Sequence, residues 1–234
     1  MNRTFRFKQF HVDDSGAAMK VGTDAVLLGC LCKAHEPLHA LDIGTGSGII
    51  ALQLAQRFPN CLIDAIEIEQ TAATQASSNF QHSPWSDRLQ LLHADVRNWD
   101  STRSYDLIVS NPPFYPDTFP MHDNLRRQAR EQETLSYQEL AYNMARLLNQ
   151  QGNCWCILPS NYENMWLDAL AVAGLYAFSI TYIRGAAHKA ANRLVVGASS
   201  RSLEKTKNEL SIRTAEGHYT AEYLKLTSDF YLFA

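Results

Sequence analysis

Between residues 39 and 158 the chain alternates short apolar runs with stretches of helical periodicity, and this alternation constrains the fold most strongly. It is typical of βαβ units, in which a helix returns the chain across a parallel sheet. We expect strands at 39–43, 62–67, 89–93, 105–110 and 154–158, with helices at about 48–58, 70–80 and 137–150. The sequence therefore predicts an α/β fold built on a mostly parallel sheet.

The expected helix at 137–150 has recognisable signals at both ends. Ser136 and Glu139 have the spacing of a capping box, and Gly152 is placed to stop the helix. After it we expect a helix near 162–173 and strands near 177–183 and 193–198, whereas the stretches 114–135 and beyond 200 look irregular. The first irregular stretch is long enough to be a functional loop rather than a simple connection.

Length and composition are those of a globular protein with one domain, or with one domain and a small appendage. The 234 residues are 46% hydrophobic and 19% charged. No apolar run reaches the ~18 residues of a membrane span. The first residues also lack the apolar stretch of a secretory signal. We therefore expect no membrane association.

The cysteines predict a reducing compartment and no metal site. The five cysteines show no CxxC spacing, and no set of His and Cys residues has the spacing of a zinc site. Cys154 and Cys156 are two residues apart in an expected strand, so both should point into the core. A cytoplasmic protein fits this pattern best.

A glycine-rich turn follows the first expected strand. Asp42 lies at the strand end, and Gly44, Gly46 and Gly48 follow at alternate positions. Glycines let the backbone turn tightly and approach a ligand at a helix N-terminus. The third glycine comes one residue earlier than in the dinucleotide pattern, and an acid before the turn suits a cation better than a pyrophosphate. This favours S-adenosylmethionine, with its ammonium and sulfonium groups, over NAD; a purely structural turn is the alternative.

Two further acids follow the next strands. Glu67 closes the strand at 62–67, where a carboxylate can bind both hydroxyls of a ribose. Asp95 follows the strand at 89–93, where it can meet an adenine amino group. Like Asp42, both lie at the carboxyl ends of parallel strands, the edge at which open sheets bind ligands.

The strand at 105–110 delivers Asn111, Pro112, Pro113 and Phe114 to the same edge. Proline biases the preceding residue toward extended dihedrals, and two prolines stiffen the backbone. If the Asn111 side-chain oxygen and the Pro112 carbonyl accept hydrogen bonds from an exocyclic amine, the nitrogen lone pair can face a methyl donor. Phe114 can stack on an extruded base. The motif predicts methylation of a planar amide or amine nitrogen; a proline-rich loop with a buried Phe is the alternative.

The net charge of −3 argues against indiscriminate nucleic-acid binding, but it hides a basic stretch. Between residues 184 and 213, two acids, Glu204 and Glu209, stand against seven cations: Arg184, Lys189, Arg193, Arg201, Lys205, Lys207 and Arg213. Lys205 and Lys207 are candidates for contact with RNA phosphates. A solvated surface is the alternative.

Together, these motifs resemble those of class I methyltransferases that act on planar nitrogens. Residues 5–10 and 19–29 resemble the N-terminal signature of the bacterial tRNA1(Val) adenine-N6 methyltransferase family, and residues 219–223 and 226–232 resemble its C-terminus. The resemblance implies a Rossmann-like sheet of seven strands with an antiparallel last strand and helices on both faces. It also implies S-adenosylmethionine as cofactor, tRNA as partner, and N6-methylation of the adenine next to the anticodon.

The resemblance also implies roles for single residues. Thr23 and Asp24 should border the methionine end of the cofactor, although they could instead cap a helix beginning near Ala25. The residues expected near the target base are Lys8, Gln9 and Phe10, of which the phenylalanine could equally belong to the core. The residues expected to hold phosphates are Arg126, Arg127 and Arg130, for which surface pairing with Glu131 and Glu133 is an equal alternative.

Several competing functions share the Asn-Pro-Pro-Phe motif. Protein glutamine methyltransferases carry a larger N-terminal domain, whereas only 41 residues precede Asp42 here. DNA adenine methyltransferases need a recognition insertion that the chain lacks. A guanine-N2 RNA methyltransferase is opposed only by the terminal signatures, and a catalytically silent RNA-binding protein by the presence of Asp42, Glu67 and Asn111.

We expect one methyltransferase domain over residues 1–234. Within it, 1–38 would lie over the cofactor and target site, 39–200 would form the catalytic core, and 201–234 would be a C-terminal extension. No motif sets the oligomeric state, and we expect a monomer.

Overall fold

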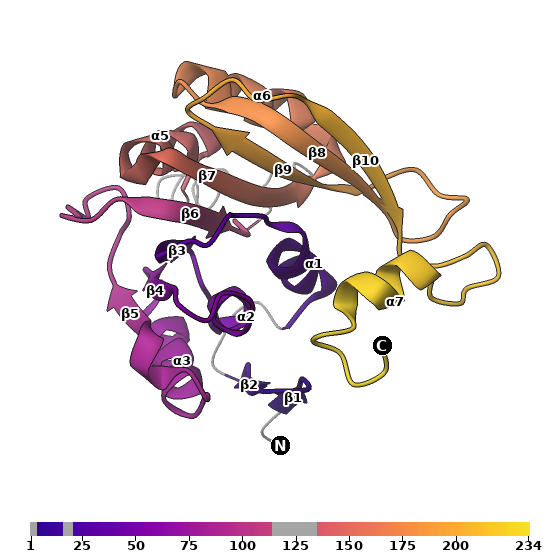
Figure 1. The fold of residues 1–234 in the computed structure, drawn as a ribbon, viewed down its shortest axis with the longest axis horizontal. Helices are drawn as coiled ribbons and strands as arrows, with labels where there is room; N and C mark the ends of the chain where they lie inside the picture. The colour runs from indigo at the N-terminus through magenta and orange to yellow at the C-terminus, as the bar shows by residue number, and fades with distance from the viewer. Residues whose placement is uncertain (1–3, 16–20, 114–134) are drawn as a thin grey trace, which may run out of the picture.

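A mostly parallel sheet of eight strands forms the centre of the described structure (Figure 1). The computed structural model describes residues 4–15, 21–113 and 135–234. The strand order is β10-β8-β9-β7-β6-β3-β4-β5, and β9 is antiparallel to both neighbours while the other pairs are parallel. The strands are β3 (His39–Ile43), β4 (Leu62–Glu67), β5 (Leu89–His93), β6 (Tyr105–Ser110), β7 (Leu148–Pro159), β8 (Tyr176–Arg184), β9 (Arg193–Ser199) and β10 (Thr206–Ser211).

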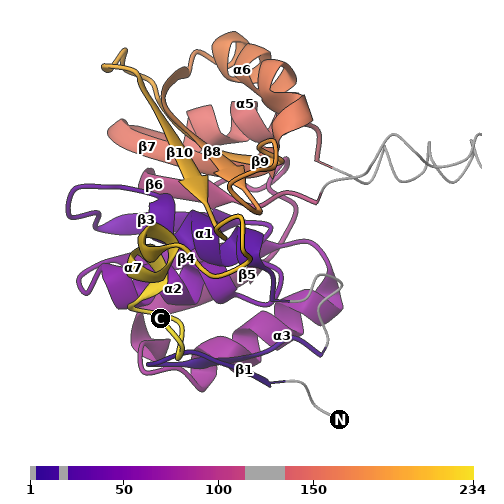
Figure 2. The ribbon, with the colours of Figure 1, turned by 90° about the vertical axis from the view of Figure 1, so that its right-hand side faces the viewer.

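Helices cover both faces of this sheet (Figures 1 and 2). One hydrophobic cluster lies under α1, α2, α3 and α7, and a second lies under α5 and α6. The helices are α1 (Thr23–Leu31), α2 (Ile49–Arg57), α3 (Gln70–Gln81), α5 (Tyr137–Leu147), α6 (Glu163–Val172) and α7 (Ala221–Thr227), with 3-10 turns at Ser86–Arg88 and Ser160–Tyr162. Within the described ranges, no helix is long and apolar enough to cross a membrane.

The predicted core of the fold is confirmed. The strands at 39–43, 62–67, 89–93 and 105–110 match β3, β4, β5 and β6 to the residue. The capping box is also present: the Ser136 hydroxyl accepts from the Glu139 amide at 3.2 Å, and the Glu139 carboxylate accepts from the Ser136 amide at 2.8 Å. Cys154 and Cys156 are buried, at 1% and 0% exposure, as their spacing predicts.

The predicted end of the helix at 137–150 is wrong. α5 ends at Leu147, and β7 begins directly at Leu148. Gly152 is therefore inside a strand rather than a helix stop. A Cβ atom at this position would lie only 2.7 Å from the Tyr105 carbonyl oxygen, so glycine is required by the close approach of β6.

The prediction of an irregular tail after residue 200 is also wrong. The tail contains β10, which pairs in parallel with β8, and α7, whose first turn is capped by the Thr220 hydroxyl. Of the six residues of β10, only Leu210 is buried, so this edge strand carries no alternating apolar signal. The sheet thus has the seven strands implied by the family resemblance, antiparallel β9 included, plus an eighth at its edge.

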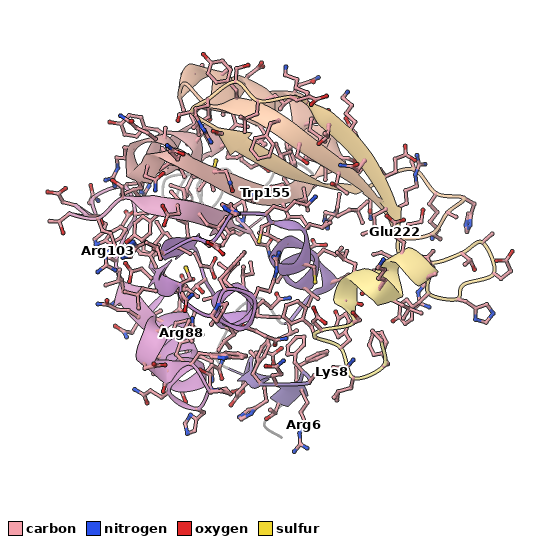
Figure 3. The ribbon with its side chains drawn as sticks, viewed as in Figure 1. Arg6, Lys8, Arg88, Arg103, Trp155 and Glu222 are labelled. Atoms are coloured by element: carbon pink, nitrogen blue, oxygen red, sulfur yellow. The ribbon has the colours of Figure 1, made fainter. Side chains whose placement is uncertain are left out.

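The two ends of the chain are joined to each other. β1 (Thr4–Arg6) and β2 (His11–Asp13) form a hairpin near the C-terminal segment. Lys8 lies beside the C-terminal segment (Figure 3). Its ammonium donates hydrogen bonds to the carbonyls of Ser228, at 2.6 Å, and Ala234, at 2.9 Å. The rings of Phe7 and Tyr231 stack with centroids 5.9 Å apart. Both terminal segments thus pack into the same hydrophobic cluster as α1 and α2.

The close approach at Gly152 generates a first prediction. Gly152→Ala should lower the free energy of unfolding by about 1–3 kcal/mol, because the added methyl group would overlap backbone atoms that cannot move freely. Gly185→Ala is the matched control, since nothing lies within 4 Å of a Cβ atom there. Urea denaturation measures both; equal effects would show that the packing at Gly152 is not limiting.

Candidate active site

The carboxyl ends of four neighbouring strands bring most of the predicted site residues to one edge. In the register, Ile43 on β3 pairs with Ser110 on β6 and with Ile66 on β4, and Glu67 pairs with His93 on β5. The Ser110 hydroxyl also donates to the Ile43 carbonyl at 2.9 Å. The predicted site residues at or just beyond these strand ends are Asp42, Gly44, Glu67, Asp95 and Asn111.

The glycine-rich turn presents bare backbone at this edge. Gly44, Gly46 and Gly48 have φ values of 71°, 57° and 85°, which a residue with a side chain adopts only with strain. A Cβ atom at Gly44 or Gly46 would meet nothing within 4 Å, so a ligand can approach this backbone closely. Gly48 differs: a Cβ atom there would lie 2.5 Å from the Phe80 ring, so this glycine serves helix packing as well.

Asp42 is a buried acid that lacks one hydrogen-bond partner. Its Oδ2 accepts a hydrogen bond from the Thr45 hydroxyl at 2.6 Å, whereas Oδ1 has no partner among the described residues. The pKa of Asp42 is raised to about 7. Burial is the main cause and outweighs the lowering effects of the Thr45 hydroxyl and the Ala51 backbone amide, and the nearby Glu67 charge adds a smaller increase. A cationic ligand at this edge would stabilise the ionised form, so the chemistry of Asp42 fits an ammonium or sulfonium group.

Glu67 is already engaged in holding the turn. Its Oε2 accepts from the Gly46 amide, and its Oε1 accepts from the amides of Ile68 and Glu69, each at 2.9 Å. A carboxylate has about four acceptor positions. One position therefore remains for a ribose hydroxyl, and binding both hydroxyls would require a backbone amide to give up its bond.

Asp95 is held by a neighbouring arginine. The Arg97 guanidinium lies 2.8 Å from Asp95 Oδ2, and its Nε donates to both carboxylate oxygens. The hydrogen bond from Arg97 lowers the pKa of Asp95, so this carboxylate stays ionised. Arg97 also approaches Glu139 at 3.8 Å and so connects the end of β5 to the capping box of α5.

Asn111 follows β6 with its acceptor unused. The side-chain Oδ1 is buried and has no hydrogen-bond partner among the described residues. Buried acceptors are rarely left without a partner, because the lost hydration costs about 1–3 kcal/mol. Pro112 is buried and Pro113 exposed, whereas the predicted stacking residue Phe114 lies outside the described residues.

Thr23 and Asp24 do not cap a helix near Ala25. α1 begins at Thr23 itself, and its N-cap is Gly22, which has no side-chain bond to offer. The Asp24 carboxylate instead forms an ion pair with Arg193 at 2.8 Å. Because Arg193 pairs with Pro159 at the carboxyl end of β7, this places the start of α1 at the same edge as Asn111.

The N-terminal residues predicted near the target base have other partners. Phe10 is buried at 6% exposure and packs between Phe7 and Trp85, with ring centroids 4.6 and 5.7 Å away, as in the core alternative. The Lys8 ammonium binds the C-terminal segment, and Gln9 is exposed.

The remaining predicted substrate residues divide into two groups. Arg126, Arg127 and Arg130 lie outside the described residues. Lys205 and Lys207 are exposed at the outer edge of the sheet, just before and on β10.

Asn79, which holds this edge together, was not among the residues predicted from sequence. Asn79 on α3 is buried at 5% exposure, and its Nδ2 donates to the carbonyls of Ser47 and Asp13, each at 2.8 Å. Its Oδ1 accepts from the Asp13 amide at 3.0 Å. Asn79 therefore fastens the N-terminal hairpin to the glycine-rich turn. The only available signal was a polar residue beside Phe80 on the buried face of a helix.

The residues of this edge fit S-adenosylmethionine. Asp42 supplies an unsatisfied acidic oxygen, Gly44 and Gly46 leave open backbone, and Glu67 keeps one acceptor position. Among the described residues, no group of three His, Cys, Asp or Glu side chains could hold a metal ion.

The raised pKa of Asp42 predicts pH-dependent cofactor binding. Below about pH 7, affinity for S-adenosylmethionine should fall about tenfold per pH unit, because the proton must leave before the cation binds. Calorimetry between pH 5 and 7.5 keeps the amino group of the ligand protonated. Asp42→Asn should bind more weakly and lose this dependence; an unchanged pH profile would contradict the assignment.

The same shift predicts how stability without cofactor varies with pH. Because the folded pKa exceeds the unfolded value of 3.8, the folded state binds the extra proton between about pH 4 and 7. The Asp42 contribution to the free energy of unfolding therefore falls as pH rises through this window. The difference between wild type and Asp42→Asn isolates it.

Asn79 predicts a separable effect on cofactor binding. Asn79→Leu removes three hydrogen bonds worth about 1 kcal/mol each, and loosening the turn should raise the KM for S-adenosylmethionine about tenfold. Asn143→Leu is the matched control, since Asn143 is equally buried, at 3%, but bonds only within α5. If both variants change stability and cofactor KM alike, Asn79 has no positioning role.

Comparison with known proteins agrees with this site. Residues 15–164 match the family model of the methyltransferase small domain. Among solved structures, a predicted O-methyltransferase from Agrobacterium tumefaciens has a TM-score of 0.67 at 18% identity, covering 88% of this chain and 96% of that chain. At this identity the likeness shows the fold alone, which is that of a class I methyltransferase.

Sequence relatives narrow the family. A tRNA1(Val) (adenine(37)-N6)-methyltransferase from Christiangramia forsetii is 40% identical over 99% of this chain and 98% of its own length. A protein of the same name from Pedobacter heparinus is 37% identical over 99% of both chains. One from Aeromonas hydrophila is 40% identical over 99% of this chain and 98% of its own. These relatives align with almost the whole chain, and the strand ends described above fit S-adenosylmethionine. The chain therefore belongs to the tRNA1(Val) (adenine(37)-N6)-methyltransferase family of class I methyltransferases, which use S-adenosylmethionine.

Proposed function

We propose that this protein methylates N6 of adenine 37 in tRNA1(Val), the reaction named for its relatives. One structural observation carries the methylation of an exocyclic amine. The Asn111 side-chain oxygen is a buried acceptor without a partner among the described residues, at the edge that also holds Asp42 and the glycine turn. An exocyclic amine supplies the missing donor.

Asn111 and Pro112 would orient the amine between two acceptor oxygens, an arrangement called the clamp below. The adenine nitrogen is a poor nucleophile because its lone pair is delocalised into the ring. Two acceptors, the Asn111 oxygen and the Pro112 carbonyl, would bind its hydrogens and favour a pyramidal nitrogen whose lone pair points away from both. Pro112 and Pro113 keep this backbone stiff, so little reorganisation is needed. No general base is required to hold the amine in this geometry.

Other residues of the edge would hold the cofactor, which supplies an electrophilic methyl group when bound. We assign the cation to Asp42, the close backbone approach to Gly44 and Gly46, and a ribose hydroxyl to Glu67. Asp95 would accept from the adenine amino group of the cofactor while Arg97 keeps it ionised. Gly48 would act through helix packing, and Thr23 and Asp24 would border the methionine end.

The substrate assignment has two parts. The relatives' names support a tRNA adenine, while the clamp alone accommodates guanine N2 equally well. Phe114 remains the predicted stacking residue, and Arg126, Arg127 and Arg130 remain predicted phosphate ligands. Lys8 and Phe10 would contribute by holding the N-terminal hairpin in place. We further propose a cytoplasmic monomer.

The clamp predicts a selective loss of catalysis. Asn111→Ala should lower kcat for tRNA methylation by at least about 10²-fold, as removal of a transition-state hydrogen-bond partner does. Its affinity for S-adenosylmethionine should change little. Asn60→Ala, an exposed asparagine before β4, is the control and should keep wild-type kcat. Near wild-type methylation by Asn111→Ala would contradict the clamp.

The target is identified by the modified nucleoside. Wild-type protein with labelled methyl donor and tRNA from a modification-deficient strain should produce N6-methyladenosine on nucleoside digestion. N2-methylguanosine would move the assignment to a guanine-N2 methyltransferase. Cofactor binding without any labelled nucleoside would point to a silent RNA-binding protein.

A further inference from the structure

We propose that the tRNA backbone is held by a basic ridge formed by His188, Lys189, Arg213 and His218. The four side chains are exposed and lie on two segments, the β8–β9 loop at 185–192 and the turn at 212–219 that connects β10 to α7. This inference rests on the proposed function, because it assigns the surface that binds the substrate of the same active site.

The register across the sheet places the ridge at the active-site end. Ser110 on β6 is at the same height in the sheet as four residues that are paired in turn across the neighbouring strands: Cys156, Val196, Ile180 and Lys207. Arg184 lies four residues beyond Ile180 on β8, which is about 13 Å further in the carboxyl direction at about 3.3 Å per residue. The loop that follows Arg184 therefore projects from the edge that carries Asn111.

Two interlocked segments make the ridge a preformed surface. The Ala187 amide donates to the Arg213 carbonyl at 2.9 Å, which ties the loop to the turn. Arg184 braces the loop by donating to the Lys189 carbonyl at 3.1 Å. The Arg213 guanidinium lies 4.2 Å from the centre of the Tyr219 ring. Its Nη1 donates to the Gly217 carbonyl at 2.6 Å. The ring and this bond orient the guanidinium and leave its other N–H groups for a phosphate.

The ridge carries positive charge that is not paired with acids among the described residues, whereas two neighbouring arginines form ion pairs. Arg184 pairs with Glu209 and Arg193 with Asp24, both at 2.8 Å. Within the described part of the chain, no ion pair joins Lys189 or Arg213 to a carboxylate. The two ridge segments contain a single acid, Glu216, so their net charge is positive.

Lys205 and Lys207 are less suited to this role. Lys207 pairs with Ile180, whose side chain belongs to the cluster under α5 and α6, and so lies on that face of β10. Glu209 follows two residues later on the same face, so the charges alternate. Leu210 faces the opposite cluster, under α1 and α7. The basic stretch between residues 184 and 213 thus has two parts: the β10 edge, where lysine and glutamate charges offset each other, and the ridge, where the positive charge remains.

Distance decides what the ridge can bind. From β6 to β8 the sheet crosses three strand spacings, about 14 Å at about 4.8 Å each. A nucleotide with its base at Asn111 does not reach that far, so the ridge must contact other phosphates of a larger polyanion. An RNA backbone has this charge and length.

A set of charge reversals tests the ridge. Lys189→Glu with Arg213→Glu should weaken binding of an unmodified tRNA1(Val) transcript by about tenfold or more at low salt. The slope of log K against log salt should become shallower by about one for each lost phosphate contact. The KM for tRNA should rise, while kcat at saturating tRNA and the affinity for S-adenosylmethionine stay at wild-type values.

The matched control makes the same charge change at the other end of the sheet. Lys33→Glu with Arg201→Glu alters two exposed cations, one after α1 and one after β9, and should weaken binding much less. Lys205→Glu with Lys207→Glu should show an intermediate effect at most. Equal losses in the ridge and control pairs would overturn the ridge.

A second pair of variants and the behaviour of the wild-type protein separate a failure of the ridge from a failure of the proposed function. His188→Glu with Lys189→Glu lies wholly in the exposed loop, and replaces the first pair if Arg213→Glu disturbs folding. Wild-type protein that neither binds nor methylates tRNA would overturn the proposed function itself. Wild-type methylation with no effect of either ridge pair would overturn only the ridge.

Discussion

The parallel register of β4, β3 and β6 is the constraint on which the rest of this molecule depends. Because Ile43 pairs with both Ile66 and Ser110, the next residues of all three strands emerge at one level. Glu67 then bonds the Gly46 amide across the gap between two strands. A shift of one residue in the β3–β4 pairing would separate the glycine turn from the Glu67 carboxylate, and a shift in the β3–β6 pairing would separate it from Asn111. The geometry of the site therefore depends directly on the register of the sheet.

Most strands and helices of the fold could be predicted from sequence. The same physical reasons explain why the end of α5 and the strand β10 could not. Central strands are buried on both faces, so their apolar runs are unmistakable. In β10 only Leu210 is buried and the first four residues are exposed, so its sequence resembles a loop. Leu148 fits the apolar stripe of α5, and only its pairing with Tyr105 on β6 shows that the helix has ended. Local sequence carries no information about such a pairing.

In the candidate site, too, sequence predicts which residues come together but not which of their atoms are already hydrogen-bonded. Asp42, Glu67 and Asn111 follow strands, and topology alone sends them to one edge. Which of their oxygens are already bonded depends on backbone amides placed by tertiary structure, so the sequence could not separate the satisfied Glu67 from the unsatisfied Asp42. Lys8 and Phe10 also have partners that local sequence does not reveal: the C-terminal carbonyls of Ser228 and Ala234 for Lys8, and Trp85 for Phe10.

The buried thiols make this chain convenient for spectroscopic labelling. Burial raises the pKa of Cys30, Cys61 and Cys154 to about 12, and raises those of Cys32 and Cys156 as well. Four of the five side chains are buried and Cys30 is half-buried. Because thiolates are the reactive form, at neutral pH all five should react slowly with maleimides and iodoacetamides. A cysteine introduced on an exposed loop, as in His188→Cys, would therefore carry a fluorophore or spin label selectively, without removal of any native thiol.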